Sequence, residues 1–163
     1  MPRSSFSIEE ALSLLAETPT RIAALTAGLT PAQLRSAPGP DEWSANDVLA
    51  HLRSCADMRG GYMRRILAED RPTIRVVNPR AWIKQTDYPA LEFAPSLRAF
   101  TTQRAALLAV LEPLTPEGWA RTATVTGAGS PLERTVLNYA DRLARHEQPH
   151  VKQIERISRS MRG

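Results

Sequence analysis

The sequence predicts an all-α protein built as a four-helix bundle. Four segments repeat apolar side chains at helical spacing, hydroxyl residues stand as N-caps before two of them, and no sustained strand pattern competes. The chain has 163 residues, of which 42% are hydrophobic and 23% charged, as in an ordinary globular protein. This length is that of one domain, so residues 1–163 are expected to form a single domain.

The first predicted helix opens at Ser7, which stands three residues before Glu10 as in a capping box. Its apolar stripe consists of Ile8, Ala11, Leu12, Leu15, Ile22 and Leu25. Pro19 lies inside this stripe and predicts a kink or a local end, because proline removes a helical hydrogen bond. A polar, proline-rich connection over residues 30–40 follows.

The second predicted helix begins after Trp43. Ser44 offers a hydroxyl cap, and the Asp47 carboxylate suits the positive end of the helix dipole. The apolar face is formed by Val48, Leu52, Cys55, Tyr62 and Ile66, although Gly60 and Gly61 weaken the middle of the helix. Residues 71–95 contain four prolines without a sustained period. They predict a long irregular connection, and connections of this length tend to be functional.

The third predicted helix runs from about Ser96, and Pro113 and Pro116 stop it. Its stripe consists of Leu97, Phe100, Leu107, Leu108 and Leu111. Residues 122–130, rich in Thr and Gly, predict a turn or a small hairpin. The fourth helix is predicted to start near Pro131, with Val136, Ala140, Leu143, Ile154 and Ile157 on its inner stripe.

Composition excludes several classes of protein. A single cysteine cannot form an internal disulfide, and no apolar run approaches the ~20 residues that cross a bilayer. The start of the chain lacks an apolar segment of signal-peptide length, so a cytoplasmic protein without a membrane partner is expected. The net charge of +4 and the pI of 9.8 suggest nucleic acid, but the basic residues are dispersed without interleaved aromatic residues. Nucleic acid is therefore not expected to be the partner.

The chain has three histidines, and their positions suggest a metal site. His146 and His150 are four residues apart and leave the same face of the fourth predicted helix, on its inner stripe. His51 stands on the second predicted helix beside its apolar positions and can also point inward. Burying three imidazoles without partners is costly, and a divalent cation removes that cost. From spacing alone, a metal site and ordinary core histidines remain equally open.

The segment from His146 to His150 formally matches the His-Glu-x-x-His signature of zinc proteases. Pro149 stands inside it and no glycine-and-histidine extension follows, so a protease is not favoured. Glu147 points about 100° away from His146 around the helix, which predicts a position behind the ligands or in solvent.

Cys55 stands one helical turn after His51. It is a conceivable fourth ligand, but a small buried hydrophobic residue is the commoner role of a free cysteine. Tyr62, Tyr139 and Trp82 are candidates to shape a pocket entrance, with core packing as the more common alternative.

Several short segments together resemble the DinB-like superfamily. They are Trp43-Ser44, residues 48–52, and His146 with His150 followed by Gln153-Ile154, supported by Thr18-Pro19, residues 82–87 and Arg104. The resemblance implies an up-down-down-up four-helix bundle that often pairs as a homodimer. It also implies a divalent metal site, with nickel or zinc, whose ligands are His51, His146 and His150.

Three neutral imidazoles would leave the metal an open coordination position, the arrangement of catalytic sites. One interpretation is a metal-dependent hydrolase that acts on a small molecule through a metal-activated water. A second is a thiol-dependent S-transferase or isomerase, in which the metal generates a thiolate from a low-molecular-weight thiol. A third is a non-catalytic bundle that binds a metal or ligand. The sequence identifies no catalytic residue; the substrate is expected to enter beside residues 71–95.

Overall fold

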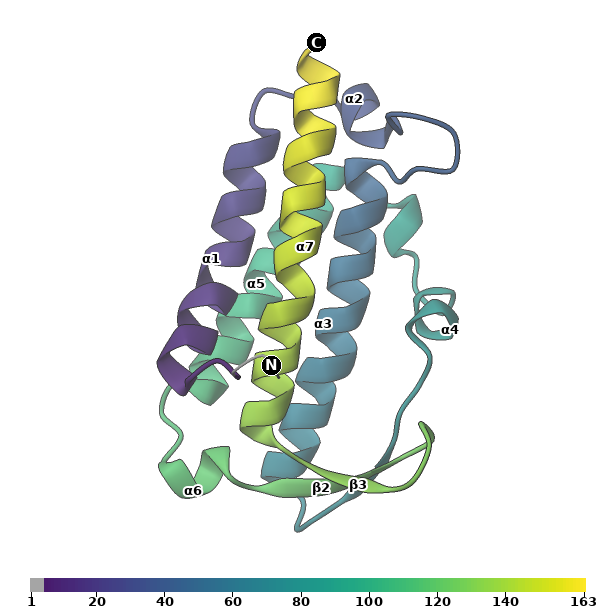
Figure 1. The fold of residues 1–163 in the computed structure, drawn as a ribbon. Coiled ribbons are helices and arrows are strands. Elements are labelled where there is room, and N and C mark those ends of the chain that lie inside the picture. Colours follow the sequence, from purple (N-terminus) through teal and green to yellow (C-terminus); the bar gives the residue numbers. More distant parts are fainter. Residues whose placement is uncertain (1–4) are drawn as a thin grey trace.

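The protein is a bundle of four long helices in a computed structural model that describes residues 5–163. These helices are α1 (Ile8–Thr26), α3 (Ala45–Ala68), α5 (Phe93–Leu111) and α7 (Val136–Arg162). In Figure 1, α1 and α7 run upward while α3 and α5 run downward. Helices α1 and α3 each pack against both α5 and α7. The predicted all-α, up-down-down-up four-helix bundle is therefore confirmed. Within the described range, no helix has the length and hydrophobicity needed to cross a bilayer.

The connection between α3 and α5 explains this topology. It contains the short strand β1 (Thr73–Arg75), the helix α4 (Pro79–Ile83) and the 3-10 helix η1 (Tyr88–Ala90). The connection climbs the outside of the bundle from its lower to its upper end (Figure 1), so α5 starts at the same end as α3. The connection is long, as predicted, but it is less irregular than the sequence indicated.

A three-stranded sheet lies across the lower end of the bundle (Figure 1). Strand β2 (Thr122–Thr126) pairs antiparallel with β3 (Leu132–Thr135) and parallel with β1. Three residues of the sheet have buried side chains, Ile74 of β1 and Ala123 and Val125 of β2. A hairpin forms here, one of the two predicted alternatives, but its second strand, β3, lies beyond the predicted residues 122–130. Strand β1 has too few residues to give a periodic signal.

Side-chain caps fix where the helices begin. Reciprocal capping boxes occur at both predicted positions, Ser7 with Glu10 before α1 and Ser44 with Asp47 before α3. Another opens α2 (Pro31–Arg35), inside the connection predicted to be polar and proline-rich. The helix α6 (Pro116–Trp119) follows α5. Short helices of this kind carry too few apolar repeats to be recognised by periodicity.

Two helix boundaries correct the prediction, and the course of α1 decides between two alternatives. Helix α7 starts at Val136 instead of near Pro131, because residues 132–135 pair with β2 and Thr135 caps the helix. Helix α5 starts at Phe93 rather than at Ser96, which places Pro95 in the first turn, where a missing N–H costs little. Helix α1 continues through Pro19, which excludes the local end, one of the two alternatives predicted there.

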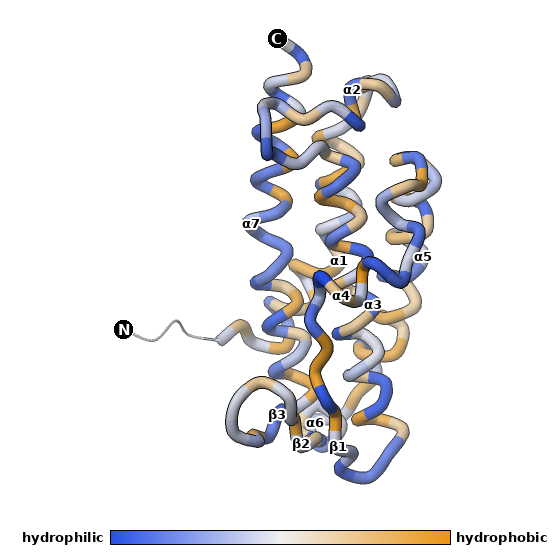
Figure 2. The backbone as a smooth tube through the Cα atoms, turned by 90° about the vertical axis from the view of Figure 1, so that its right-hand side faces the viewer, coloured by the Kyte–Doolittle hydropathy of each residue, from blue (hydrophilic) through white to orange (hydrophobic). Residues whose placement is uncertain are grey.

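The predicted stripes form the core. Figure 2 shows hydrophobic and hydrophilic residues alternating along the long helices. Side chains from all four helices are fully enclosed, among them Leu15, Ile22, Leu52, Ile66, Phe100, Leu111, Leu143 and Ile154. Gly60 is buried where α3 packs on α5, and a Cβ built there would lie 3.9 Å from Leu107 Cδ1. The glycine that weakens α3 locally thus lies at a helix–helix contact, where an added Cβ would meet Leu107 at ordinary van der Waals distance.

We expect Ser44→Ala to lower the free energy of unfolding by about 1 kcal/mol, because Ser44 Oγ accepts a hydrogen bond from the backbone N–H of Asp47. Urea denaturation followed by circular dichroism measures this change. Ser130→Ala, at an exposed position outside the helices, is the matched control and should stay near the wild-type value. Equal stabilities of the two variants would contradict the assigned role of the cap.

Candidate metal centre

The three histidines lie close together where α3 packs against α7. His51 comes from α3, and His146 and His150 come from successive turns of α7. Their ring centroids are 4.9 Å apart for His51 and His146, 4.8 Å for His51 and His150, and 4.8 Å for His146 and His150. The Nε2 atoms of His51 and His146 are 3.0 Å apart. The structure therefore brings together all three residues that the sequence singled out.

Cys55 joins this histidine cluster. Its Sγ lies 3.7 Å from His51 Nε2, one helical turn along α3. The potential ligand atoms of His51, Cys55 and His146 all lie within 4.8 Å of one another. Cys55 is only 2% exposed, and burial raises the pKa of its thiol, so the free side chain is a neutral thiol at neutral pH. It is a potential fourth donor as well as a small core residue.

The imidazoles of His51 and His146 are held in their neutral form. Burial lowers the pKa of His51 to about 4, with further lowering by His150 and Arg59. Burial likewise lowers the pKa of His146 to about 3, with Arg59 as the strongest charged neighbour. A neutral imidazole keeps a nitrogen lone pair, which is the form that binds a metal. At neutral pH these two rings are therefore ready to coordinate without losing a proton.

Two neighbours orient His150. Its Nδ1 lies 2.9 Å from Gln153 Oε1, so Nδ1 carries the hydrogen and Nε2 keeps the lone pair. The indole of Trp43 stacks on His150 with an interplanar angle of 13° and a centroid distance of 6.2 Å. The same indole lies 5.2 Å from His51 and is 42% exposed. Trp43 thus lies against two of the three histidines and also faces solvent.

The cluster fits a divalent cation. His146 Nδ1 is buried and has no hydrogen-bond partner among the described residues. Burying such a polar atom unsatisfied costs free energy, and an ion bound at Nδ1 itself would compensate for it. Imidazole and thiolate donors suit zinc, nickel and copper better than magnesium or calcium. The donor set and the unsatisfied ring therefore both favour a transition-metal ion.

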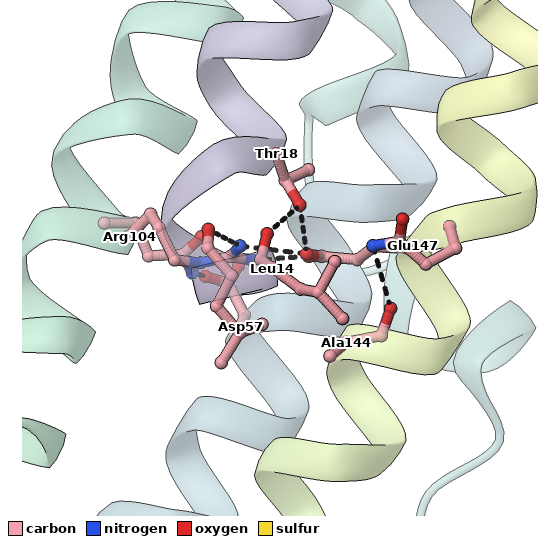
Figure 3. A network of polar contacts seen from close by, with 9 residues as sticks. Leu14, Thr18, Asp57, Arg104, Ala144 and Glu147 are labelled. Carbon is pink, nitrogen blue, oxygen red and sulfur yellow. Dashed lines mark hydrogen bonds and ion pairs between the residues drawn. The ribbon is translucent and has the colours of Figure 1, made fainter. Parts of the chain in front are cut away.

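Glu147, next to His146 in sequence, lies in a buried polar network with Arg104 and Thr18 (Figure 3). Arg104 Nη1 donates to Glu147 Oε1 over 2.9 Å, and Arg104 Nη2 donates to Oε2. Thr18 Oγ1 donates to the same Oε1 over 2.9 Å, and Arg104 also reaches the carbonyl oxygen of Leu15. Glu147 is 0% exposed, so the predicted alternative of a solvent-facing side chain is wrong. A carboxylate held by three donor hydrogens is not available as a protease base.

Three cavities border the cluster. One of about 660 Å³ lies between His51 and residues 79–89 of the connection. A second of about 500 Å³ lies beside Trp43 and His150. A third of about 450 Å³ begins at Cys55 and extends toward the sheet. The connection over residues 71–95 thus forms walls of the first and third cavities, as expected for an entrance.

Side-chain contacts attach the connection over residues 71–95 to α3. Tyr88 donates its hydroxyl to Asp57, and the guanidinium of Arg53 lies 3.7 Å from the centre of the Tyr88 ring. Of the aromatic residues considered from the sequence, Tyr62 and Tyr139 line the third cavity, and Trp82 is half-buried on α4. Tyr88 and Asp57 were missed, because a contact between a helix and a loop 31 residues later leaves no periodic signal.

Comparisons with known proteins agree with this fold. A model of the DinB superfamily matches residues 14–154. The solved structure of YfiT from Bacillus subtilis superposes with a TM-score of 0.81 at 23% sequence identity, covering 99% of this chain and 93% of that one. YfiT is described as a probable metal-dependent hydrolase with an unusual four-helix bundle topology. No protein among those with curated descriptions matches the chain.

Proposed function

This chain belongs to the DinB superfamily, and we propose that it is a hydrolase that depends on one divalent metal ion, nickel or zinc, held by His51, His146 and His150. The carrying observation is that three imidazoles from two helices lie side by side, with their ring centroids 4.8–4.9 Å apart. A relative in fold, YfiT, is described as a probable metal-dependent hydrolase, which supports the same reaction class.

The chemistry follows from the donor set. When bound, the metal would act as a Lewis acid that activates water and polarises the bond to be cleaved. An imidazole that binds a metal is a neutral ligand, so three of them would neutralise none of the ion's charge and favour an anionic or polarised oxygen beside it. Gln153 fixes the tautomer of His150, which directs its Nε2 lone pair away from Gln153. Substrate would reach the histidines through the cavities walled by residues 71–95.

We expect the protein loaded with zinc or nickel to hydrolyse a small activated ester such as p-nitrophenyl acetate. Removal of the metal with EDTA should lower the rate at least about tenfold, and the same metal should restore it, because activation of water depends on the ion. Release of p-nitrophenolate measures the reaction. His150→Ala, assayed at the same metal concentration, should resemble the EDTA-treated protein.

The thiol-dependent alternative is distinguished in the same assay. Adding a low-molecular-weight thiol without an amine, such as 2-mercaptoethanol, should leave the rate of a true hydrolase nearly unchanged after correction for the metal-free background. A rate that is insensitive to EDTA would contradict metal dependence. A reaction that proceeds only with the thiol and yields the S-acyl product would replace the hydrolase by an S-transferase.

A further inference from the structure

The cavity that begins at Cys55 has an unusual charge. It is enclosed by α3, α7, the β2–β3 hairpin and residues 76–79, and we call it the arginine pocket because Arg59, Arg134 and Arg142 all line it. No aspartate or glutamate is among its lining residues. The remaining wall is largely apolar, with Met58, Val76, Val77, Val125 and Leu132. The pocket therefore combines three cations with an apolar surface.

Several charged and polar side chains of this pocket lack ion-pair or hydrogen-bond partners among the described residues. Each of the ion pairs found among residues 5–163 involves other arginines, so Arg59, Arg134 and Arg142 have no carboxylate partner there. Arg59 Nη1 is buried without a hydrogen-bond acceptor. The hydroxyl of Tyr139 is also unpartnered, although this residue is only 3% exposed. Unsatisfied buried donors are costly and are commonly explained by a ligand or water that completes them.

The electrostatic surroundings point the same way. Burial lowers the pKa of Arg59, and the nearby charge of Arg142 lowers it further, yet a guanidinium remains charged at neutral pH. Burial raises the pKa of Tyr139, so its hydroxyl is a neutral hydrogen-bond donor. Glu147 is the one carboxylate that acts on Arg59, and both of its oxygens are already bound by Arg104. The positive charge in the pocket is thus left without a counterion.

We propose that the arginine pocket binds the acidic group of a small organic anion, a carboxylate or a phosphate monoester, with its apolar body against the valine-rich wall. Guanidinium groups match both oxyanions through paired charge-assisted hydrogen bonds, and Tyr139 would add a neutral donor. Cys55 lines the pocket and contacts His51, so an anion bound there lies next to the histidine cluster. The inference that this anion is the substrate of the enzyme rests on the proposed function. Binding of the anion to the arginine pocket does not itself require the metal.

Isothermal titration of metal-free protein with benzoate and phenyl phosphate tests the proposal, with benzamide as a neutral analogue of similar shape. We expect one saturable site for at least one anion and at least about tenfold weaker binding of benzamide, because charge-assisted hydrogen bonds would be missing. The preferred anion identifies the acidic group. Equal affinities of benzamide and the anions, or no saturable binding, would overturn the proposal.

Substitutions of pocket residues test whether the anion binds in the arginine pocket. Arg59→Gln should weaken anion binding at least about tenfold, and Tyr139→Phe should weaken it severalfold without loss of packing. Arg142 is exposed, so Arg142→Gln should fold normally and still weaken binding. Arg98→Gln, an exposed arginine on α5 away from the pocket, is the control. A loss in Arg98→Gln equal to that in the pocket variants would contradict the site.

Anion binding and metal-dependent hydrolysis can fail separately. Unchanged anion binding in a protein without metal-dependent activity would overturn the proposed hydrolase and keep the pocket. Metal-dependent ester hydrolysis with no anion binding would overturn the arginine pocket as a binding site and keep the proposed hydrolase.

Discussion

Arg104→Met is expected to be among the most destabilising single substitutions in this protein, lowering the free energy of unfolding by about 3–5 kcal/mol. It leaves the Glu147 carboxylate, which is 0% exposed, with Thr18 as its remaining side-chain donor. Breaking a buried ion pair is costly because an uncompensated charge stays in the interior. Equilibrium denaturation in urea, followed by circular dichroism, measures the loss.

The matched control is Arg159→Met on α7. Arg159 forms an ion pair with Glu155 at i,i+4 spacing, but its side chain is 77% exposed. Such surface pairs contribute about 0.3–0.5 kcal/mol, so this variant should unfold almost like the wild type. If Arg104→Met cost no more than Arg159→Met, the buried pair would have no special role.

A double substitution distinguishes the effect of the unpaired charge from the effect of lost packing. Replacing Arg104 and Glu147 together by Met and Leu removes both charges, so most of the loss in Arg104→Met should be recovered. The coupling between the two sites follows from the double-mutant cycle. Equal destabilisation of the single and double variants would show that packing, rather than the unpaired charge, dominates.

The local features of this protein were readable from its sequence. Ser44 and Asp47 predicted the start of α3, and the 3.6-residue period predicted the buried faces of the long helices. The inner-stripe position of His146 and His150 on α7 allowed them to meet His51, and the resemblance to the DinB-like superfamily implied that they do. The predictions of caps and buried faces depend on neighbours within a few residues along the chain.

The features that were missed depend on distant partners. Helical spacing gave the direction of Glu147 but not the arginine 43 residues earlier that it meets, so solvent remained an alternative. The short strand β1 exists because β2, about 50 residues later, pairs with it. The arginine pocket combines residues of α3, β3 and α7, and no spacing rule relates them. The tertiary fold therefore had to be known before these groups could be assigned.

Removal of one histidine is expected to reduce metal affinity by at least about a hundredfold, because a ligand to the ion is lost. The wild-type protein should bind close to one equivalent of zinc or nickel. His51→Ala, His146→Ala and His150→Ala should each lose most of it at equal metal concentration. Competition with a chromophoric chelator measures the dissociation constant, and mass spectrometry of the native protein measures the stoichiometry.

Cys55→Ser distinguishes the two ligand sets that the geometry offers. With the three histidines as ligands, Cys55→Ser changes metal affinity only severalfold, whereas His150→Ala abolishes tight binding. The alternative ligands are His51, Cys55 and His146, whose donor atoms all lie within 4.8 Å of one another. With that set, Cys55→Ser abolishes tight binding, whereas His150→Ala changes metal affinity only severalfold. The second ranking would overturn the three-histidine assignment.

Two further substitutions test whether the loss is specific to the ligands. Lys152→Ala changes an exposed residue of α7 close to His150 and should leave both the stoichiometry and the affinity unchanged. Gln153→Ala removes the acceptor for His150 Nδ1, 2.9 Å away, and should weaken binding by about 10–100-fold. This intermediate loss is expected because Gln153 orients a ligand without being one. A fully retained affinity in Gln153→Ala would indicate that the tautomer of His150 does not matter to the ion.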